Sequence, residues 1–180
     1  MTEQVIIPSY ITLIEEWAHA RNLINGSDAK AQFFKLVSEL GEWAGAVIIG
    51  DRDEVIDGIG DAFVVSTIMA RQLGTTVMEI LEIGGVSGFK PFSDLAILVV
   101  LGNLGDALAK GQTEKSQMYL GALVFSLLKA SSRHGLDINN CLSRAYNDIK
   151  DRKGVMYNGV FIKSTDERYE SAVAELAAIA

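Results

Sequence analysis

The sequence predicts an all-α protein, a bundle of helices, and three observations carry this prediction. Hydrophobic residues make up 49% of the 180 residues, enough to fill a packed core. The chain contains only two prolines, the residue that helix interiors tolerate least. Apolar residues recur at the spacing of a helix face and rarely alternate as they do in half-buried strands.

The helical spacing of apolar residues divides the chain into successive segments separated by turn residues. It predicts helices at residues 9–24, 29–49, 53–73, 76–82, 93–110, 114–134, 138–150 and 166–180. Residues that favour helix ends stand at several of these boundaries. The expected N-caps are Ser9, Ser27 or Asp28, Asp137 and Thr165, and Gly74 is the expected residue after the third helix.

Two segments between these helices lack helical spacing. The glycine-rich stretch 84–92 is expected to be a linker between two halves of the chain. The stretch from residue 151 to the last helix is expected to be irregular, with turns at Gly154 and at Asn158-Gly159.

The two halves resemble each other. Leu40-Gly41-Glu42 matches Leu104-Gly105-Asp106, and glycines at 60 and 74 bracket a helix of the same length as those at 121 and 135. This predicts one domain, 1–180, built from repeats at 9–83 and 93–150, with a tail and a helix at 151–180. Helical hairpins also match by chance. In the second repeat most of the acids of the first are missing.

Composition limits the classes of partner and compartment. The net charge of −7 argues against binding nucleic acid or an anionic membrane. The N-terminus has no basic stretch typical of a signal peptide, and the longest apolar run, within 94–109, is too short to span a membrane. Cys141 is the only cysteine, so a reducing cytoplasm is the expected setting.

Five acids are spaced at about one helical turn in the segment from 35 to 74. Two belong to the second predicted helix and three to the third: Glu39, Glu42, Glu54, Asp57 and Asp61. The sector of the three acids continues as apolar residues, so this face is expected to point partly inward. Carboxylates that converge there would repel each other, and a bound Mg²⁺, Mn²⁺ or Ca²⁺ would relieve the repulsion. The alternative is that they are ordinary surface residues of two amphipathic helices.

Four segments together resemble one enzyme family. WAHARNLI, QFFKLVSELGEWA, DGIGDAFVV and AYNDIKDRKGVMYNGVFIK are similar to the MazG-like branch of the all-α nucleoside triphosphate pyrophosphohydrolases, with the dimeric dUTPases as more distant relatives. The resemblance implies an all-α bundle that hydrolyses (d)NTPs to monophosphate and pyrophosphate with Mg²⁺, for which Mn²⁺ is a possible substitute. It also implies a role in nucleotide-pool maintenance and a homo-oligomer, for which we expect a homodimer.

The motif of this family is ExxE, a spacer and ExxD. Glu39 and Glu42 match the first pair, and either is a candidate to orient or deprotonate the attacking water. The second pair departs from the motif, because Gly58 stands three residues before Asp61. Asp57 or Glu54 would then supply the missing oxygen, and both registers remain open.

The expected substrate contacts are cations for the pyrophosphate, an amide and an aromatic ring. They are Lys35, Lys150, Arg152 and Lys153 for phosphate, Asn147 for sugar or base, and Trp17 for stacking on the base. The alternatives are a cationic helix end for the run at 150–153 and a core position for the tryptophan.

Other functions fit the sequence less well. Glu16-x-x-His19 matches one arm of a di-iron carboxylate bundle, but the second arm is missing. The sequence has no phosphate-binding P-loop and no zinc-type cluster. The main rival is a non-catalytic helical module that binds a metal or a partner.

Overall fold

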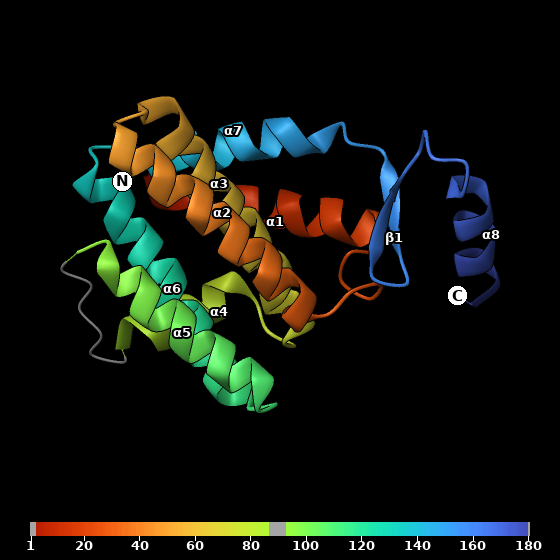
Figure 1. Cartoon of the computed structure of the whole chain (residues 1–180), viewed down its shortest axis with the longest axis horizontal. Helices are drawn as coiled ribbons and strands as arrows, with labels where there is room; N and C mark the ends of the chain where they lie inside the picture. The colour runs from red at the N-terminus through yellow and green to blue at the C-terminus, as the bar shows by residue number, and fades with distance from the viewer. Residues whose placement is uncertain (1–2, 87–92, 180) are drawn as a thin grey trace.

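A computed structural model of the chain describes residues 3–86 and 93–179, and within them it confirms the predicted all-α bundle. Within these residues eight helices and one small hairpin follow each other along the chain (Figure 1). They are α1 (Glu3–Ala20), α2 (Ala29–Ile49), α3 (Arg52–Gln72), α4 (Val77–Val86), α5 (Leu95–Ala109), α6 (Thr113–Arg133), α7 (Ile138–Lys150), β1 (Gly154–Tyr157), β2 (Val160–Lys163) and α8 (Tyr169–Ile179).

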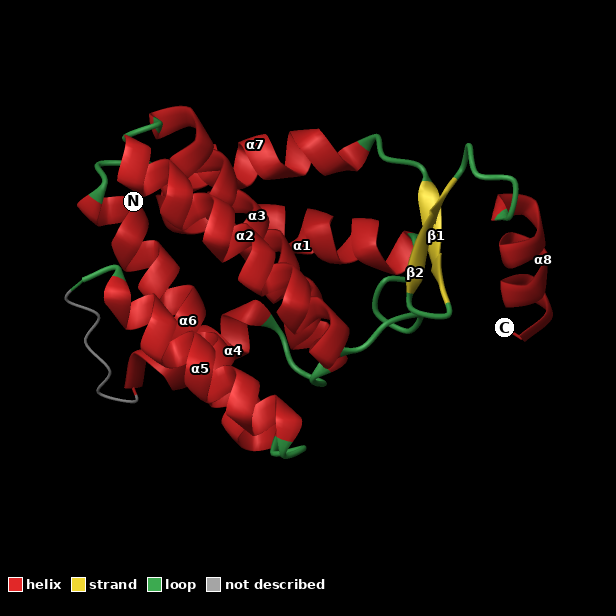
Figure 2. Ribbon diagram, viewed as in Figure 1, coloured by secondary structure: helices red, strands yellow, loops and turns green. Residues whose placement is uncertain are grey.

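Two antiparallel helix pairs form the centre of the bundle. α2 packs along α3, α5 packs along α6, and the two pairs meet through α2 against α5 and α3 against α6. Helix α4 lies against α6, and α1 and α7 lie against α3. Figure 2 shows the hairpin beyond the end of α1, followed by α8, which packs on the hairpin.

Several predicted helix ends are confirmed. The Asp28 carboxylate accepts a hydrogen bond from the Ala31 amide at 2.8 Å, and Asp137 caps α7 through the Asn139 amide at 2.9 Å. The short turn between α2 and α3 has Gly50 in the left-handed region, with φ 76°, and Asp51 as the N-cap of α3. Gly74 also has a positive φ, 77°, as expected of a residue that terminates a helix.

Other boundaries were predicted wrongly. α1 begins at Glu3, before Pro8, so that the proline lies inside the helix and Ser9 is not its cap. α4 continues through Gly84 to Val86, which shortens the expected linker, and the rest of that linker, residues 87–92, lies outside the described residues. At the start of α8 it is Asp166, not Thr165, whose carboxylate accepts the Arg168 amide, at 3.0 Å.

The segment predicted to be irregular forms a β-hairpin. Strands β1 and β2 pair antiparallel, with Met156 opposite Phe161. The turn between them is Asn158-Gly159, and both residues have a positive φ, 48° and 77°. A two-residue turn of this kind matches the twist of the strands, which is why Asn-Gly is a strong hairpin signal. The predicted turn at Asn158-Gly159 is therefore confirmed. The predictions of an irregular segment and of a turn at Gly154 are wrong, because Gly154 is the first residue of β1 and pairs with Lys163.

Helices α2 and α3 approach each other closely at Gly58. A Cβ atom placed there would lie 2.7 Å from the Trp43 Cβ and 2.9 Å from the Trp43 Cα. Backbone at this distance leaves no room for a side chain. The packing therefore excludes an acidic side chain at position 58.

Two further glycines sit at helix crossings. Gly60 of α3 packs on the backbone of Cys141 in α7, and Gly121 of α6 packs on the backbone of Ile80 in α4. These two glycines occupy matching positions of the two predicted repeats. The duplication itself stays a prediction.

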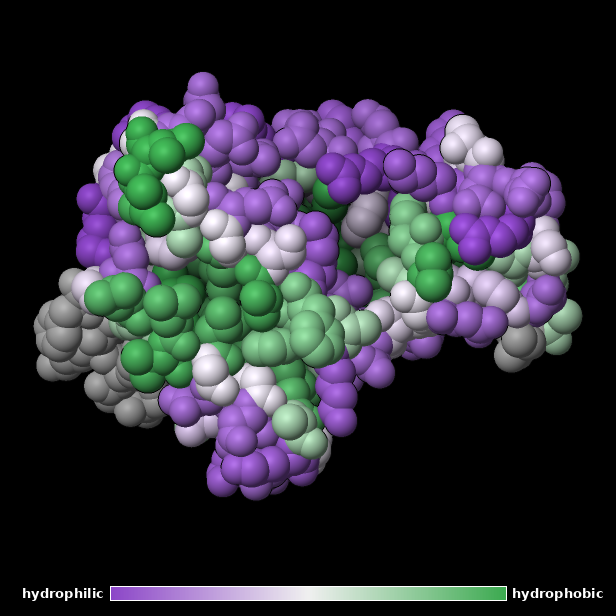
Figure 3. Space-filling model, viewed as in Figure 1, coloured by the Kyte–Doolittle hydropathy of each residue, from purple (hydrophilic) through white to green (hydrophobic). Residues whose placement is uncertain are grey.

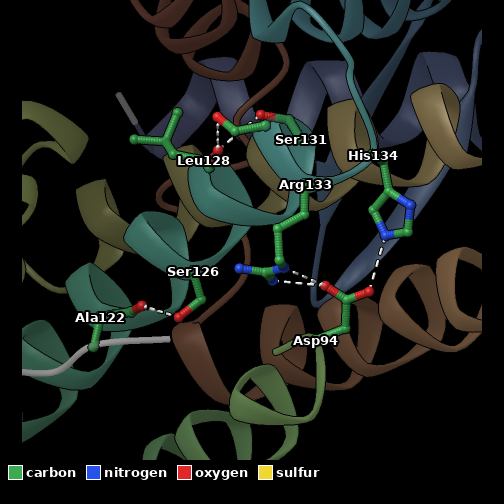
Figure 4. A network of polar contacts seen from close by, with 8 residues as sticks. Asp94, Ala122, Ser126, Leu128, Ser131, Arg133 and His134 are labelled. Atoms are coloured by element: carbon green, nitrogen blue, oxygen red, sulfur yellow. Dashed lines mark hydrogen bonds and ion pairs between the residues drawn. The ribbon is translucent and has the colours of Figure 1, made fainter. Parts of the chain in front are cut away.

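An ion-pair network joins the start of α5 to the end of α6 (Figure 4). The Asp94 carboxylate accepts from Arg133 Nη2 at 2.6 Å and faces His134 Nε2 at 2.9 Å. Burial raises the pKa of Asp94, but the hydrogen bonds from Arg133 and His134 outweigh it, so the pKa lies below its usual value. Arg52 of α3 donates to the carbonyl of His134 at 3.1 Å, which connects this network to the central pair.

None of the described helices combines the length and the apolar character that crossing a bilayer requires.

The crossing at Gly58 makes a testable prediction about stability. Gly58→Ala should lower the free energy of unfolding by about 1–3 kcal/mol, because the added methyl group pushes against Trp43 backbone. The measurement is urea unfolding followed by circular dichroism. The matched control is Gly41→Ala in α2, where nothing lies within 4 Å of the added atom. This control should be neutral or raise stability by up to about 1 kcal/mol. Equal effects of the two substitutions would contradict the close crossing.

Candidate active site

A cavity of about 350 Å³ opens along one side of the α2–α3 pair. Its walls come from the end of α1, from α2 and α3, from the end of α7 and from the hairpin. The lining residues are Trp17, Leu23, Ser27, Ala31, Gln32, Lys35, Glu39, Asp61, Val64, Val65, Ile68, Ile149, Arg152, Met156, Gly159 and Phe161.

The cavity has an acidic end and an apolar end. Along α2 it is lined by Gln32, Lys35 and Glu39, which share one face of the helix. Along α3 the lining passes from Asp61 to Ile68. Because α3 runs antiparallel to α2, the aspartate lies beside the glutamate and the isoleucine lies toward the glutamine. The site therefore offers charge at one end and apolar surface with one amide at the other.

Glu39 supplies a buried carboxylate to the acidic end. The residue is 5% exposed, and its partner is the Lys35 ammonium one turn earlier, with which it forms an ion pair. The lysine side chain is 57% exposed. The acid is thus held inside the cavity, and its neutralising cation reaches out to solvent.

Asp61 is the carboxylate whose protonation the site changes most. Burial raises its pKa to about 6, and the neighbouring negative charges of Glu39 and Asp57 add to the effect. The charges of Arg152 and Lys35 oppose it but do not cancel it. Such repulsion between half-buried acids is what a bound divalent cation would relieve.

Asp57 lies near Asp61 but already has a cationic partner. Arg144 of α7 donates through Nε to the Asp57 carboxylate at 3.1 Å, and its Nη1 lies 3.9 Å from the Asp53 carboxylate. The sequence did not point to Arg144, because its distance of 87 residues along the chain hides the contact. To bind a metal ion, the Asp57 carboxylate would have to give up its ion pair with Arg144.

The other two predicted acids lie outside the cavity lining. Glu42 is exposed and accepts a hydrogen bond from the Ser38 hydroxyl at 3.3 Å, and Glu54 is exposed near the start of α3. Across residues 3–86 and 93–179 no three His, Cys, Asp or Glu side chains form a group arranged to hold a metal ion. The structure thus brings Glu39 and Asp61 together with Asp57 close by, whereas a ligand role for the outer two stays a prediction.

Of the predicted phosphate-binding cations, Lys35 and Arg152 line the cavity. Arg152 is positioned by a hydrogen bond from its Nε to the Asp148 carbonyl at 3.1 Å. The remaining predicted polar contacts are exposed and outside the lining. They are Asn147, which accepts from Lys150 Nζ at 2.7 Å, Lys150 itself and Lys153.

Trp17 lines the cavity, as a base-stacking residue requires. The Arg21 guanidinium lies over its ring, 4.9 Å from the ring centroid, and also donates to the Arg152 carbonyl at 2.6 Å. Stacking on a base is therefore left to the other face of the ring. The same arginine ties the end of α1 to the segment that carries Arg152.

Sequence reasoning missed the hairpin wall and the amide at the apolar end. Met156 and Phe161 form one cross-strand pair, and both side chains line the cavity. The Asn158-Gly159 turn between two short apolar runs was the signal that predicts them. Gln32 precedes Glu39 by seven residues, which places both on one helix face.

Two other chemically reactive groups stand apart from this cavity. Glu16 and His19 line a separate surface depression with Glu15 and Arg71. Cys141 is fully buried between α7 and α3, and burial raises the pKa of its thiol to about 11. At neutral pH this thiol is protonated, which disfavours a role as a nucleophile.

The raised pKa of Asp61 predicts how stability depends on pH. In the folded protein the group holds its proton up to about pH 6, above its ordinary value of 3.8. The folded state therefore binds more protons than the unfolded state, and stability falls as the pH rises from about 4 to above 6. In EDTA, Asp61→Asn should stabilise the protein at pH 8 by about 1–2 kcal/mol, a value discounted for partial solvent access, and by much less at pH 4.5.

Urea unfolding at the two pH values measures this difference. The matched control is Glu42→Gln, which removes an exposed carboxylate and should change stability by less than about 0.5 kcal/mol at either pH. A stabilisation of the Asp61 variant that is equal at both pH values would contradict the proposed charge repulsion.

Comparison with known proteins adds one short similarity. Over 59 residues the chain is 46% identical to an uncharacterized 18.2 kDa protein from the rep-hol intergenic region of Haemophilus phage HP1. The matched segment covers 33% of this chain and 36% of the phage protein, so it spans little more than a third of that relative. No family model and no solved structure matches the chain.

Proposed function

We propose that this protein is a Mg²⁺-dependent nucleoside triphosphate pyrophosphohydrolase that converts (d)NTP to (d)NMP and pyrophosphate. One observation carries the proposal. Glu39 and Asp61, from adjacent helices, face one cavity that also contains two cations and an apolar end with an aromatic ring. The resemblance of the sequence to MazG-like enzymes supports the same activity, which serves the nucleotide pool of the cytoplasm.

Repulsion between the negatively charged substrate and the two carboxylates explains why this cavity needs a metal ion to bind a triphosphate. A triphosphate carries about four negative charges and would be repelled by two carboxylates at close range. Glu39 and Asp61 would hold the ion, with Asp57 as the nearest further oxygen donor. When bound, Mg²⁺ would neutralise phosphate charge and lower the pKa of a coordinated water. The carboxylate pair and its unfavourable charge fit such an ion.

The remaining lining residues have separate roles in the proposal. Glu39, buried and held by Lys35, is the candidate to accept a proton from the attacking water. Arg152 and Lys35 compensate the charge of the departing pyrophosphate. Trp17 stacks on the base. Water is excluded from the base end by the apolar wall of α3 and by the hairpin pair Met156 and Phe161.

The rival function is a non-catalytic helical module. It is favoured by the ion pairs Lys35–Glu39 and Arg144–Asp57, which satisfy two of the acids without any metal. An activity assay decides between the two functions.

The assay measures pyrophosphate release from a panel of (d)NTPs with Mg²⁺ and with EDTA. The wild type should be active with Mg²⁺ alone, and Glu39→Gln or Asp61→Asn should reduce kcat/KM by about 100-fold or more, because each removes a metal-binding charge. The matched control is Glu82→Gln, an exposed acid of α4 outside the cavity, which should keep full activity. If the folded wild type releases no pyrophosphate from any (d)NTP of the panel, the non-catalytic module is favoured.

We propose further that two copies of the chain associate through α2 and α5. Exposed apolar side chains gather on these neighbouring helices, as Figure 3 shows. They are Phe34 (74% exposed), Val37 (40%), Ile48 (84%), Leu95 (69%), Leu98 (59%) and Val99 (60%). Their combined area is on the order of several hundred Å², which matches the largest apolar patch of a typical monomer and approaches one side of a standard interface.

The shape of this patch favours a second copy as its occupant. Gly41 and Gly45 lie on the same face of α2 between Phe34 and Ile48, and nothing lies within 4 Å of the place where a side chain would begin. In a two-fold arrangement, the Phe34 or Ile48 side chain of one copy can therefore lie over the surface at Gly41 and Gly45 of the other copy.

Sedimentation or light scattering at micromolar concentration tests the assembly. We expect a dimer, and Ile48→Lys should convert it to a monomer because it buries a charge in an apolar contact. Val160→Lys, which changes an equally aliphatic residue on the hairpin, 53% exposed and outside the patch, should leave the dimer intact. A monomeric wild type would refute the dimer without bearing on the activity.

A further inference from the structure

Gln32 is a buried side chain without a partner in the cavity. The residue is 8% exposed and lines the apolar end, and among the described residues its amide makes no hydrogen bond. Gln117, by contrast, donates to the Leu73 carbonyl at 2.8 Å, and Gln72 donates to the Leu23 carbonyl at 3.0 Å, although the Gln72 Oε1 is itself buried without a partner. The Gln32 amide atoms are not among the fully buried polar atoms that lack a partner, so they face the open cavity, where a ligand can bond to them.

The position of Gln32 relative to the acids identifies the part of a ligand that it meets. Seven helical residues separate it from Glu39, which is about 10 Å along the axis of α2. Leu23 and Ile68 lie at this end of the lining, and the hydrogen bond from Gln72 holds the loop that carries Leu23. With phosphates at the acidic end, the surface around Gln32 is left for a flat, largely apolar ring with polar atoms at its edge, which describes a nucleobase.

The chemistry of an amide determines what such a residue can distinguish. A glutamine offers a carbonyl acceptor and an N–H donor side by side. Each nucleobase presents an adjacent donor and acceptor on its pairing edge, but keto and amino bases present them in opposite order. An amide fixed by a neighbour would select one order. Gln32 has no such neighbour among the described residues and can turn to match either.

We infer that Gln32 recognises the pairing edge of the substrate's base and that its free amide makes the site accept keto and amino bases alike. This inference rests on the proposed function for its substrate. It assigns to one residue both the preference for a nucleotide over bare polyphosphate and the tolerance between bases.

Two substitutions at position 32 test the inference in steady-state hydrolysis of dUTP, dCTP, dGTP and dATP at pH 8. In the wild type, kcat/KM for dUTP and dCTP should agree within about tenfold. Gln32→Glu, which can only accept hydrogen bonds when ionised, should shift the dUTP to dCTP ratio toward dCTP by about tenfold or more, because the single donor of uracil lies between two carbonyl acceptors. Gln32→Met should raise KM by about tenfold for all four substrates with little change in kcat.

Thermal unfolding separates recognition from a structural role. Because Gln32 pairs with no described residue, Gln32→Met should leave the melting temperature unchanged or raise it, whereas a structural glutamine should lower it. Gln117→Met is the matched control, since it removes a paired amide outside the cavity. That variant should melt at a lower temperature and keep the wild-type ratio between bases.

Each outcome bears on the inference. An unchanged dUTP to dCTP ratio in Gln32→Glu, a wild-type preference above about 100-fold for one base type, or a lower melting temperature of Gln32→Met with unchanged KM would overturn it. If no triphosphate is hydrolysed, the proposed activity fails, and calorimetric titration of wild type and Gln32→Glu with dUMP and dCMP tests the base contact alone. If the dissociation constants of dCMP and dUMP are the same for the wild type and Gln32→Glu, the inference would then be overturned.

Discussion

The antiparallel contact between α2 and α3 is the constraint on which the site depends. Their backbones approach closely where Gly58 crosses Trp43, and a side chain at position 58 would force the two helices apart. Asp61 lies near enough to Glu39 to feel its charge, and the two acids line one cavity. The pKa of Asp61 is raised to about 6, which shows that this position disfavours the charged form of the carboxylate. Because a fold rarely keeps such repulsion without a use, the pair is the strongest indication of a cation site.

Elements outside this pair complete the cavity and limit the repulsion. Arg144 of α7 neutralises Asp57, and Lys35 neutralises Glu39 from the solvent side. The hairpin adds an apolar wall with Phe161, and Arg21 fixes one face of Trp17. Charge, apolar surface and the free amide of Gln32 therefore come from segments far apart in the sequence. A triphosphate is a ligand that could use all three.

The sequence predicted the helices well because their signals are local. Asp28, Gly50 and Asp137 end or begin helices through their own backbone preferences, and each was confirmed or lay at the expected turn. Pro8 misled the prediction, since proline favours a helix start but here lies inside α1. The hairpin was not predicted although Asn158-Gly159 is a strong turn signal, because each strand has only four residues, too few for an alternating pattern to stand out.

The candidate site was predictable only in part. Glu39 and Asp61 are among the five acids that helical spacing predicts to converge, but the spacing alone does not separate them from the other three. The partners of those acids could not be predicted, since Arg144 and the hairpin reach the site through packing between distant segments. Glu42 and Glu54 show the limit of the pattern: their spacing matches that of the cavity acids, but both side chains are exposed. The exclusion of a side chain at Gly58 by Trp43 is likewise a property of the packed helices and not of the motif.

The most direct test of the central claim is a crystal structure with Mn²⁺ and a non-hydrolysable (d)NTP analogue, recorded with anomalous diffraction. The account predicts an anomalous peak bound by the carboxylates of Glu39 and Asp61, with the triphosphate beside it and the base at the end of the cavity that holds Gln32. A well-ordered analogue bound elsewhere, or no manganese between these two acids at saturating concentration, would contradict it.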